Sequence, residues 1–426
     1  MKSYRIDGFR STTKIEDALE TILKVLGKLD SSLETIPTEN SLGRILGEDV
    51  VSRFDIPSYD KSAVDGYAVM AKDTFGSSTT NPVELKIIGE TAAGVSSSFH
   101  LRGKEAVQVA TGAHVPEGAD AVIMVEETKR MDKDAMHVFS SVAPGDNVVK
   151  SGDDVKKGSI VLKRGRRIEP QDIGMLVALG VEKTCVARKP IVGVASTGEE
   201  LVAAAREGGL GKTVDVNRPI LMNLVRECGG VPVDLGIARD KAEDIGARIG
   251  EGLEKCDIVL VSAGTSVGKA DLVPDVISSL GKPGMLVHGI SMRPGMPAGL
   301  AVVNGKPIVS LPGHPVAAMI GFRVFASHLI RLMLGVAYED RVLITAKLMR
   351  RIPSSLGMRT FARVLVKRSS DGYVAEPVRT SGSSILSTMI ISNGVVAIPE
   401  RREGIEAGEL VEVELFRPVE REINNE

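Results

Sequence analysis

Apolar residues recur at helical spacing near the start of the chain, and polar residues fill the positions between them. Thr12-Thr13 precede this segment and Gly27 follows it, which are typical residues before and after a helix. The face that the spacing predicts comprises Ile15, Ala18, Leu19, Ile22, Leu23 and Leu26. The pattern therefore predicts an amphipathic helix that ends near Gly27.

A second helix is predicted over Ile173 to Leu179, because Pro170 and Asp172 are favoured at helix starts and Gly180 follows. The two helices flank a run of short strands, so we expect them to pack together in one discontinuous domain. That linker and dimerisation domain would comprise residues 1–55 and 150–188.

Residues 56–149 show the pattern of short strands separated by Gly, Pro, Asn and Asp. The segments with this pattern are VELKIIGE, AVQVATGAHVP, AVIMVEE and MHVFSSV. Strands of this length with turn residues between them predict a small β domain.

Strands alternate with helices in residues 189–337. Apolar strand segments are IVGVAS, VPVDLGIA, DIVLVSA, MLVHGI, GLAVV and PIVSLPG, and amphipathic helical segments start near Asn217, Asp240, Val273 and Pro315. This alternation predicts a doubly wound, mostly parallel sheet. In residues 338–426 the short alternating strand segments return, which favours a compact C-terminal β barrel or sandwich. The fold class is thus multidomain α/β plus β.

Composition narrows the function classes. The chain has 426 residues, enough for several domains, and its formal net charge of -2 favours neither nucleic acid nor an anionic membrane as a partner. Aromatic residues are too few for a platform on which bases stack. The N-terminus lacks an apolar signal region, no run of about 18 uncharged apolar residues occurs, and the three cysteines lack C-x-x-C spacing. We expect a cytoplasmic protein without a membrane partner.

One strand leads directly into a loop suited to an anion. Ile258 to Ser262 is followed by Gly264-Thr265-Ser266-Val267-Gly268, in which the glycines permit close approach and the hydroxyls can donate hydrogen bonds. The spacing differs from the Walker A motif, and no G-x-G-x-x-G follows a strand. The common nucleotide-binding sites are therefore excluded, and the loop is either an anion site or a simple turn.

Other loops of the same domain should reach the same edge, because ligands of such sheets bind at the carboxyl ends of the strands. Their candidate substrate-binding residues are Ser196, Thr197, Gly198, Asp215, Asn217, Pro312, Gly313, His314 and Pro315, together with Gly264, Thr265, Ser266 and Gly268. Pro315 at a helix start would leave free N–H groups facing a ligand. These residues together predict a site for a phosphorylated small molecule, although each alone could be an ordinary strand-to-helix turn.

Two carboxylates are candidate ligands for a metal ion. Asp271 follows the loop and Asp240 follows a strand, and Mg²⁺ prefers carboxylate and phosphate oxygens. Asp240 has the alternative role of a helix N-cap. The histidines form no cluster with metal-ligand spacing, so a zinc site is not expected.

The ordered motifs of the chain resemble those of molybdopterin molybdenumtransferases, a family that includes the C-terminal domain of gephyrin. The resemblance covers essentially the whole chain and rests on Ser62-Ala63-Val64-Asp65-Gly66-Tyr67-Ala68, Thr111-Gly112-Ala113, Ser196-Thr197-Gly198-Glu199-Glu200-Leu201, Asp215-x-Asn217, Ser262-Ala263-Gly264-Thr265-Ser266-Val267-Gly268 and Pro312-Gly313-His314-Pro315.

The resemblance implies an enzyme that binds adenylylated molybdopterin, takes molybdate, releases AMP with Mg²⁺ and yields molybdenum cofactor. It also implies a homodimer with an intersubunit active site and a transient contact with molybdopterin adenylyltransferase. The residues that match functional positions of the family are Asp65, Thr111, Glu200, Arg363 and Ser384, with Asp240 and Asp271 as metal ligands.

The chain departs from the family pattern in one basic segment. Where the family has Lys-Pro-Gly-Lys-Pro, this chain has Arg293-Pro294-Gly295-Met296-Pro297, so Arg293 remains as a catalytic candidate that could hold an oxyanion in bidentate fashion. His314 stands where Asn is usual. These departures keep open a tungstate preference or a non-catalytic molybdopterin-binding scaffold, whereas the additional domains argue against an adenylyltransferase.

Overall fold

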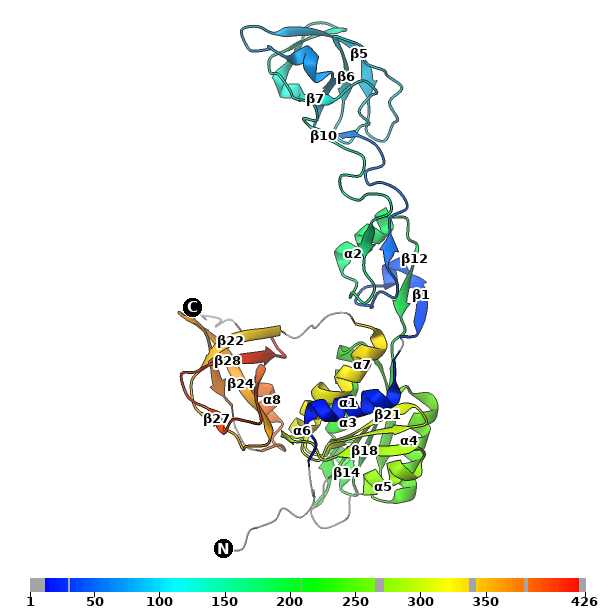
Figure 1. The fold of residues 1–426 in the computed structure, drawn as a ribbon, viewed down its shortest axis with the longest axis vertical. Coiled ribbons are helices and arrows are strands. Elements are labelled where there is room, and N and C mark those ends of the chain that lie inside the picture. Colours follow the sequence, from blue (N-terminus) through cyan, green and yellow to red (C-terminus); the bar gives the residue numbers. More distant parts are fainter. Residues whose placement is uncertain are drawn as a thin grey trace. The chain divides into compact units, whose positions relative to one another are not determined.

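The computed structural model describes residues 12–29, 31–207, 209–264, 272–336, 342–378 and 382–420. They form two compact units, which Figure 1 shows in the colours of the sequence. The first, here called the α/β unit, comprises Met1–Gly47, Gly165–Glu169 and Lys183–Glu426. The second, the β unit, comprises Glu48–Arg164 and Pro170–Glu182. The four domain ranges expected from the sequence are finer than this division and stay predictions.

The central sheet of the α/β unit has six strands, of which four are parallel neighbours. Its order is β16 (Val231–Ala238), β13 (Ile191–Thr197), β17 (Ile258–Ala263), β21 (Lys306–Pro312), β20 (Gly299–Val303) and β18 (Pro283–His288). β20 pairs antiparallel with both of its neighbours, β21 and β18. The mostly parallel sheet predicted from the sequence is thus confirmed, with an antiparallel edge that was not foreseen.

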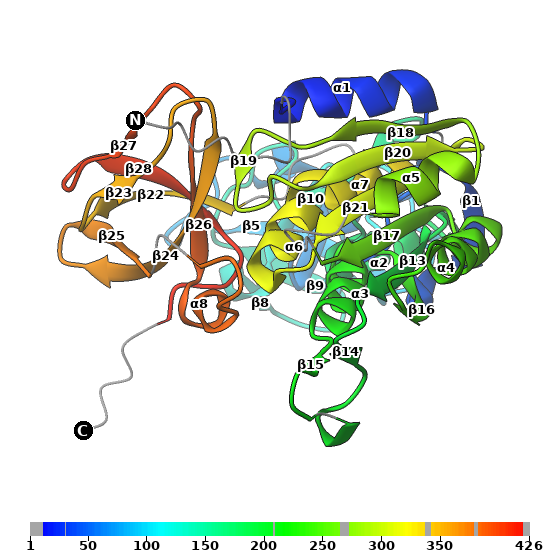
Figure 2. The same ribbon diagram turned by 90° about the horizontal axis from the view of Figure 1, so that it is seen from below.

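Helices cover both faces of this sheet. One core joins α1 (Ile15–Leu26), α3 (Asn217–Glu227) and α7 (Ser327–Leu334) to strand residues such as Leu260, and the other joins α4 (Ala242–Lys255) and α5 (Leu272–Ser279) to the alternate residues, such as Val261. Since successive strand side chains face opposite sides, the sheet is doubly wound. Figure 2 shows α1 beside β18 and β20.

Helix α1 packs differently from the expectation. Its buried residues Ile15, Ala18 and Ile22 belong to the α/β core, whereas α2 (Pro170–Ala178) belongs to the β unit. The structure therefore does not place these two helices together in one core, because the apolar face of α1 is occupied by the sheet.

The segment Pro315–Leu334 is one continuous helical stretch with a change of winding. It comprises α6 (Pro315–Gly321), a π-helical turn at Phe322–Ala326 and α7. Of the described residues, this is the one helix long and apolar enough to cross a membrane, with a mean hydropathy of 1.5. Phe322, Phe325 and Leu329 are fully buried in the core of the α/β unit, which is the usual reason for such apolarity.

The C-terminal strands of the α/β unit close into a barrel. The strands, in order, are β24 (Arg359–Ser369), β25 (Gly372–Pro377), β22 (Val342–Leu348), β28 (Leu410–Leu415) and β26 (Gly394–Ile398), and β26 pairs again with β24. This closure confirms the predicted barrel and decides against the sandwich. A short strand from the α/β core, β19 (Met292–Arg293), pairs in parallel with the start of β24.

The β unit contains a curled sheet of six strands. Their order is β7 (Ala121–Met124), β4 (Gly66–Val69), β6 (Glu105–Val109), β5 (Val83–Thr91), β9 (Ala135–Val138) and β8 (Thr128–Arg130). Alternate residues of β4 and β7 enter two different apolar cores, so both faces of the sheet are covered. The small β domain predicted from the sequence is confirmed.

Short two-stranded ladders complete both units. In the α/β unit they pair β1 (Leu33–Pro37) with β12 (Lys183–Ala187), β14 (Leu201–Val202) with β15 (Thr213–Val214), and β23 (Ile352–Pro353) with β27 (Gly404–Ile405). In the β unit they pair β2 (Val50–Val51) with β11 (Ile160–Leu162) and β3 (Lys61–Ser62) with β10 (Val148–Val149). Helix α8 (Ser387–Ile391) follows the barrel strand β25 in sequence.

Candidate functional site

The carboxyl ends of the four parallel strands lie side by side. In the sheet register Thr197 pairs with Ala238 and with Ala263, and Ala263 pairs with Pro312. The loops that follow these strands therefore share one edge. We call this region the carboxyl-edge site; its described members are Ser196, Thr197, Gly198, Glu200, Asp215, Asn217, Asp240, Gly264, Pro312, Gly313, His314 and Pro315.

Asn217, the first residue of α3, connects the ends of two strands. Its Nδ2 donates to Ser262 Oγ at 2.8 Å and to the carbonyl oxygen of Gly313 at 2.8 Å. The residue is only 6% exposed. The N-terminus of α3 is thus fixed over the ends of β17 and β21, between the two glycine-containing loops.

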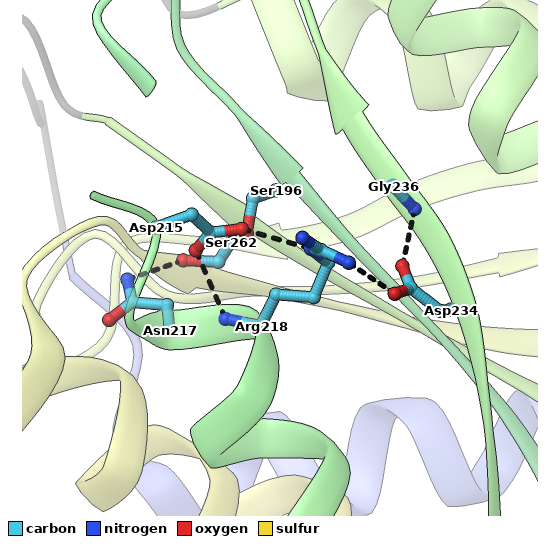
Figure 3. Close-up of polar contacts among 7 residues, drawn as sticks. All are labelled: Ser196, Asp215, Asn217, Arg218, Asp234, Gly236 and Ser262. Carbon is cyan, nitrogen blue, oxygen red and sulfur yellow. Dashed lines mark hydrogen bonds and ion pairs between the residues drawn. The ribbon is translucent and has the colours of Figure 1, made fainter. Parts of the chain in front are cut away.

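A buried carboxylate fixes the same helix start to β13. Figure 3 shows Asp215 between Ser196 and Arg218. Asp215 Oδ1 accepts from Ser196 Oγ at 3.1 Å and from the Arg218 N–H at 3.1 Å, and Asp215 Oδ2 accepts from Arg218 Nε at 3.0 Å. The carboxylate therefore orients both the Ser196 hydroxyl and the first turn of α3.

Arg218 extends this network to the edge strand β16, and the sequence analysis did not single it out. Its Nη1 donates to Asp234, whose other oxygen accepts from the Gly236 N–H at 2.8 Å (Figure 3). Burial lowers the pKa of Arg218, but the hydrogen bonds to Asp234 and Asp215 outweigh it and leave the pKa above its usual value. The spacing of three between Asp215 and Arg218, which is a favourable pair at a helix start, was the available signal.

The glycines of the site allow close packing of its loops. A Cβ placed on Gly313 would lie 2.8 Å from Gly264 Cα, and one placed on Gly198 would lie 2.9 Å from Glu200 Oε1. Any side chain at Gly313 would therefore force two strand ends apart. The Glu200 carboxylate also lies near Gly264, 3.8 Å from the position of a Cβ there.

Asp240 is not the N-cap of α4. That position belongs to Lys241, and α4 begins at Ala242 without a side-chain cap. The N-cap alternative is therefore wrong. Instead, Asp240 Oδ2 accepts from the N–H of Glu199 at 3.4 Å, which brings this carboxylate to the loop after β13.

Of the two proposed metal ligands, the structure describes Asp240 only. Asp271, like Thr265, Ser266 and Gly268, lies outside the described residues. Within the part of the chain that the structure describes, no group of three or more His, Cys, Asp or Glu residues could hold a metal ion. Glu200 and Asp240 nevertheless supply carboxylate oxygens at the carboxyl edge, and such donors suit Mg²⁺ when phosphate oxygens complete its coordination.

A loop of the C-terminal barrel meets the start of α6. His314 holds the N-cap position with extended backbone and no side-chain cap, and Pro315 begins the helix. The Val316 N–H donates to the carbonyl oxygen of Ser383 at 3.1 Å. Ser384, the next residue, is exposed. The loop that carries it therefore lies beside the start of α6.

Two arginines come from strands that pair with each other. Arg363 lies on β24, is 3% exposed, and burial lowers the pKa of its guanidinium. Phe361, on the same face of β24, packs with Val316 and Ile320 of α6. Arg293 pairs with Thr360 through β19, and its side chain is exposed. Both cations thus belong to the region where the barrel meets the α/β core.

In the β unit, Asp65 and Thr111 form a separate pair. Asp65 Oδ1 accepts from the Thr111 N–H at 2.7 Å and from Thr111 Oγ1 at 2.9 Å. The Thr111 backbone N–H and then its hydroxyl hold the pKa of Asp65 below its usual value. Gly66, which follows Asp65, pairs with Val109, two residues before Thr111, between β4 and β6, and this pairing brings the two side chains near each other.

Known proteins resemble the chain over nearly its full length. Three family models match consecutive parts: "MoeA N-terminal region (domain I and II)" at residues 13–180, "Probable molybdopterin binding domain" at residues 193–332 and "MoeA C-terminal region (domain IV)" at residues 345–416. The second of these spans the strands and helices that carry the carboxyl-edge site.

Individual relatives agree with these matches. A Methanocaldococcus jannaschii protein named for molybdopterin biosynthesis is 35% identical, over 91% of this chain and 93% of its own. The molybdopterin molybdenumtransferase of Bacillus subtilis is 33% identical, over 90% of each chain. A crystal structure of a molybdopterin biosynthesis protein from Pyrococcus horikoshii has 36% identity and a TM-score of 0.82, covering 95% of this chain and 100% of that one. The chain therefore belongs to the MoeA family of molybdopterin molybdenumtransferases.

Proposed function

We propose that the chain is a molybdopterin molybdenumtransferase, which inserts molybdate into adenylylated molybdopterin and releases AMP to give molybdenum cofactor. The observation that carries the proposal is the carboxyl-edge site, where Asn217 joins the ends of β17 and β21. Polar groups that are fixed before a ligand arrives bind it with a small ordering cost. Membership of the family makes this reaction the first to test.

The residues of the site divide into two chemical groups. The loop sequence that starts at Gly264 is suited to the phosphates, because its glycines permit close approach of an anion and its hydroxyls can donate to it. Arg293, Arg363 and Ser384 are suited to molybdate, since guanidinium groups and a hydroxyl donate to oxyanions.

The family also implies Mg²⁺, for which Asp240 and Asp271 are our proposed ligands. When bound there, the ion would neutralise charge on the pyrophosphate whose cleavage releases AMP. Glu200, whose carboxylate faces the Gly264 backbone, is placed to orient the same part of the substrate.

The β unit would contribute through a second copy of the chain. We propose a homodimer in which Asp65 of the partner subunit acts at the carboxyl-edge site of the first subunit. An exposed, ionised carboxylate oriented by Thr111 is suited to such a role, because it has no other side-chain partner among the described residues. A cytoplasmic location and a transient contact with molybdopterin adenylyltransferase, which would supply the substrate, belong to the same proposal.

The test is incubation of the purified protein with adenylylated molybdopterin, molybdate and Mg²⁺. We expect AMP release that depends on all three components. AMP release no faster than in a reaction without protein would contradict the proposal. Tight binding of the substrate with no AMP release would instead support a non-catalytic molybdopterin-binding scaffold.

Met296 is the reason to add a second set of reactions, with tungstate, to the same experiment. It stands where the family has a lysine, so a cation that would face an oxyanion is absent from this position. A preference for tungstate is the alternative that this difference favours. Parallel reactions with molybdate and tungstate, compared by the rate of AMP release, would decide which oxyanion the protein prefers.

A further inference from the structure

The side-chain oxygen of Asn217 has an unusual environment. Oδ1 is buried, and it has no hydrogen-bond partner among the described residues. Most buried polar atoms in proteins are paired, because an unpaired acceptor loses its hydration without compensation. An unpaired acceptor at a proposed ligand site indicates that the ligand supplies the missing donor.

The orientation of this amide follows from its neighbours. The carbonyl oxygen of Gly313 can only accept a hydrogen bond, so the Asn217 nitrogen must face it. Ser262 Oγ donates to the carbonyl oxygen of Pro312 at 3.4 Å and therefore accepts from the other Asn217 amide hydrogen. Both hydrogens of Nδ2 are used, and turning the amide over would bring Oδ1 against a carbonyl oxygen.

The position of the side chain is also fixed. Asp215 binds the first turn of α3 through the Arg218 N–H, and Arg218 connects that turn to β16 (Figure 3). Gly313, whose carbonyl oxygen accepts from the amide, packs so closely on Gly264 that a Cβ at Gly313 would lie 2.8 Å from Gly264 Cα. Nδ2 is therefore held against Ser262 and Gly313 at the ends of β17 and β21, and Oδ1 is held as an acceptor on the same fixed amide.

We propose that Asn217 Oδ1 is a specificity-determining acceptor that binds an N–H group on the heteroaromatic ring of the ligand. It selects rings that carry an amino group and rejects rings that present an oxygen or no donor there. This inference rests on the proposed function, which supplies two such rings: the 2-aminopterin and the adenine of adenylylated molybdopterin. A polar site built for a donor rejects a ligand that lacks it more strongly than an apolar pocket would.

Two pairs of probes distinguish the rings. AMP is compared with purine riboside 5′-monophosphate, which lacks the amino group of adenine, and pterin-6-carboxylate is compared with lumazine-6-carboxylate, which has oxygen in place of the 2-amino group. Binding to the full chain is measured by calorimetry. We expect one pair to differ by about 10-fold in Kd, as leaving one buried acceptor unpaired predicts. The pair that differs identifies the ring.

Three variants distinguish the effect of losing the acceptor from the effect of disturbing the fold. Asn217→Leu removes the acceptor at similar size, and the two probes of the selected pair should then bind equally. Asn217→Asp keeps an oxygen at Oδ1 but replaces the Nδ2 donor by an oxygen that faces the Gly313 carbonyl oxygen, so the acceptor loses its fixed position and the preference should shrink. Asn223→Leu makes the same change at an exposed position of α3 and should leave every Kd unchanged. Thermal unfolding of each variant checks that it is folded.

Two results would overturn the inference. One is a wild-type protein that binds neither pair or does not discriminate within either pair, as expected if Oδ1 is only hydrated. The other is discrimination that persists in Asn217→Leu. Neither result depends on AMP release, so a protein that turns over substrate without ring discrimination refutes this inference alone, and one that discriminates without turnover refutes only the proposed reaction.

Discussion

The two polar clusters of this protein are held in different ways. At the carboxyl-edge site, Asp215, Arg218 and Asn217 are bonded to one another or to strand ends, and the Asp215 side chain is almost fully buried. In the β unit, Asp65 is exposed and is oriented by Thr111 alone. The first cluster is therefore part of the fold, whereas the second is available to a ligand or another surface. Removal of the Asp215 carboxylate should accordingly change stability, whereas removal of the Asp65 carboxylate should change activity.

The largest effect is expected for Asp215→Ala. Its side chain is 1% exposed, and its loss leaves Arg218 and the Ser196 hydroxyl without this partner. Removing one member of a buried ion pair costs about 3 kcal/mol of unfolding free energy. Denaturant unfolding followed by circular dichroism measures this loss. Asp234→Ala is the control, because the Asp234 side chain is 45% exposed and its loss should cost under about 1 kcal/mol. Equal losses would contradict the assignment of Asp215 to the buried framework.

Asp65→Ala should show the opposite behaviour. We expect only a small loss of stability, because the carboxylate and its bonds to Thr111 are exposed to water, and AMP release reduced by about 100-fold, the usual scale for a polar group that acts in the reaction. Unfolding curves and AMP release are measured on the same preparation. Asp132→Ala, at another exposed aspartate of the β unit, controls for loss of surface charge. An Asp65→Ala protein destabilised as much as Asp215→Ala would remove the contrast between the clusters.

Arg218→Lys should have an intermediate effect. A lysine keeps the charge but cannot bond Asp215 and Asp234 together through a planar guanidinium. We expect the KM for adenylylated molybdopterin to rise about 10-fold with kcat nearly unchanged, since Arg218 positions the helix start and does not touch the reacting atoms. Arg226→Lys, on the exposed face of α3, should change neither constant. A fall in kcat with an unchanged KM would contradict this positioning role.

The smallest effect concerns the titration of Asp65. Thr111→Val removes the hydroxyl donor but keeps the backbone N–H, which is the larger cause of the low pKa, so the pKa of Asp65 should rise only part of the way to its usual value. Because the folded-state pKa is depressed, the pair favours the folded state above the unfolded-state pKa and loses this contribution as pH falls through the folded value. Carboxyl NMR, with Asp65→Asn for assignment, measures the shift. An unchanged or lower pKa would contradict the hydroxyl contact.

Local patterns in the sequence were sufficient to predict most of the helices and strands. The apolar spacing of α1 and its end at Gly27, which has a left-handed φ of 67°, followed from side-chain size and glycine alone. The antiparallel edge was missed although Asn304-Gly305, both with positive φ between β20 and β21, is the usual signal of a tight hairpin. The carboxyl ends of the parallel strands could be grouped from the sequence because parallel sheets align them.

Other features depended on long-range contacts that no local pattern contains. To predict that α1 packs against the sheet, one must know which part of the apolar sheet face the other helices leave uncovered. The bridge from Arg218 to Asp234 joins residues 16 positions apart on different elements. The orientation of the Asn217 amide is set by its bond to Gly313, which lies 96 positions away. Side-chain orientation at a site is thus set by tertiary contacts, even where the residue type is visible in a motif.

The most direct test of an active site shared between two subunits is complementation between two inactive variants. Asp65→Ala and Asp240→Ala proteins are unfolded, mixed in equal amounts and refolded together, and AMP release is measured. If the site combines the carboxyl edge of one subunit with Asp65 of the partner subunit, one of the two sites in each mixed dimer is intact, and activity should return to about a quarter of the wild type. Activity no higher than that of either variant alone would contradict a shared site.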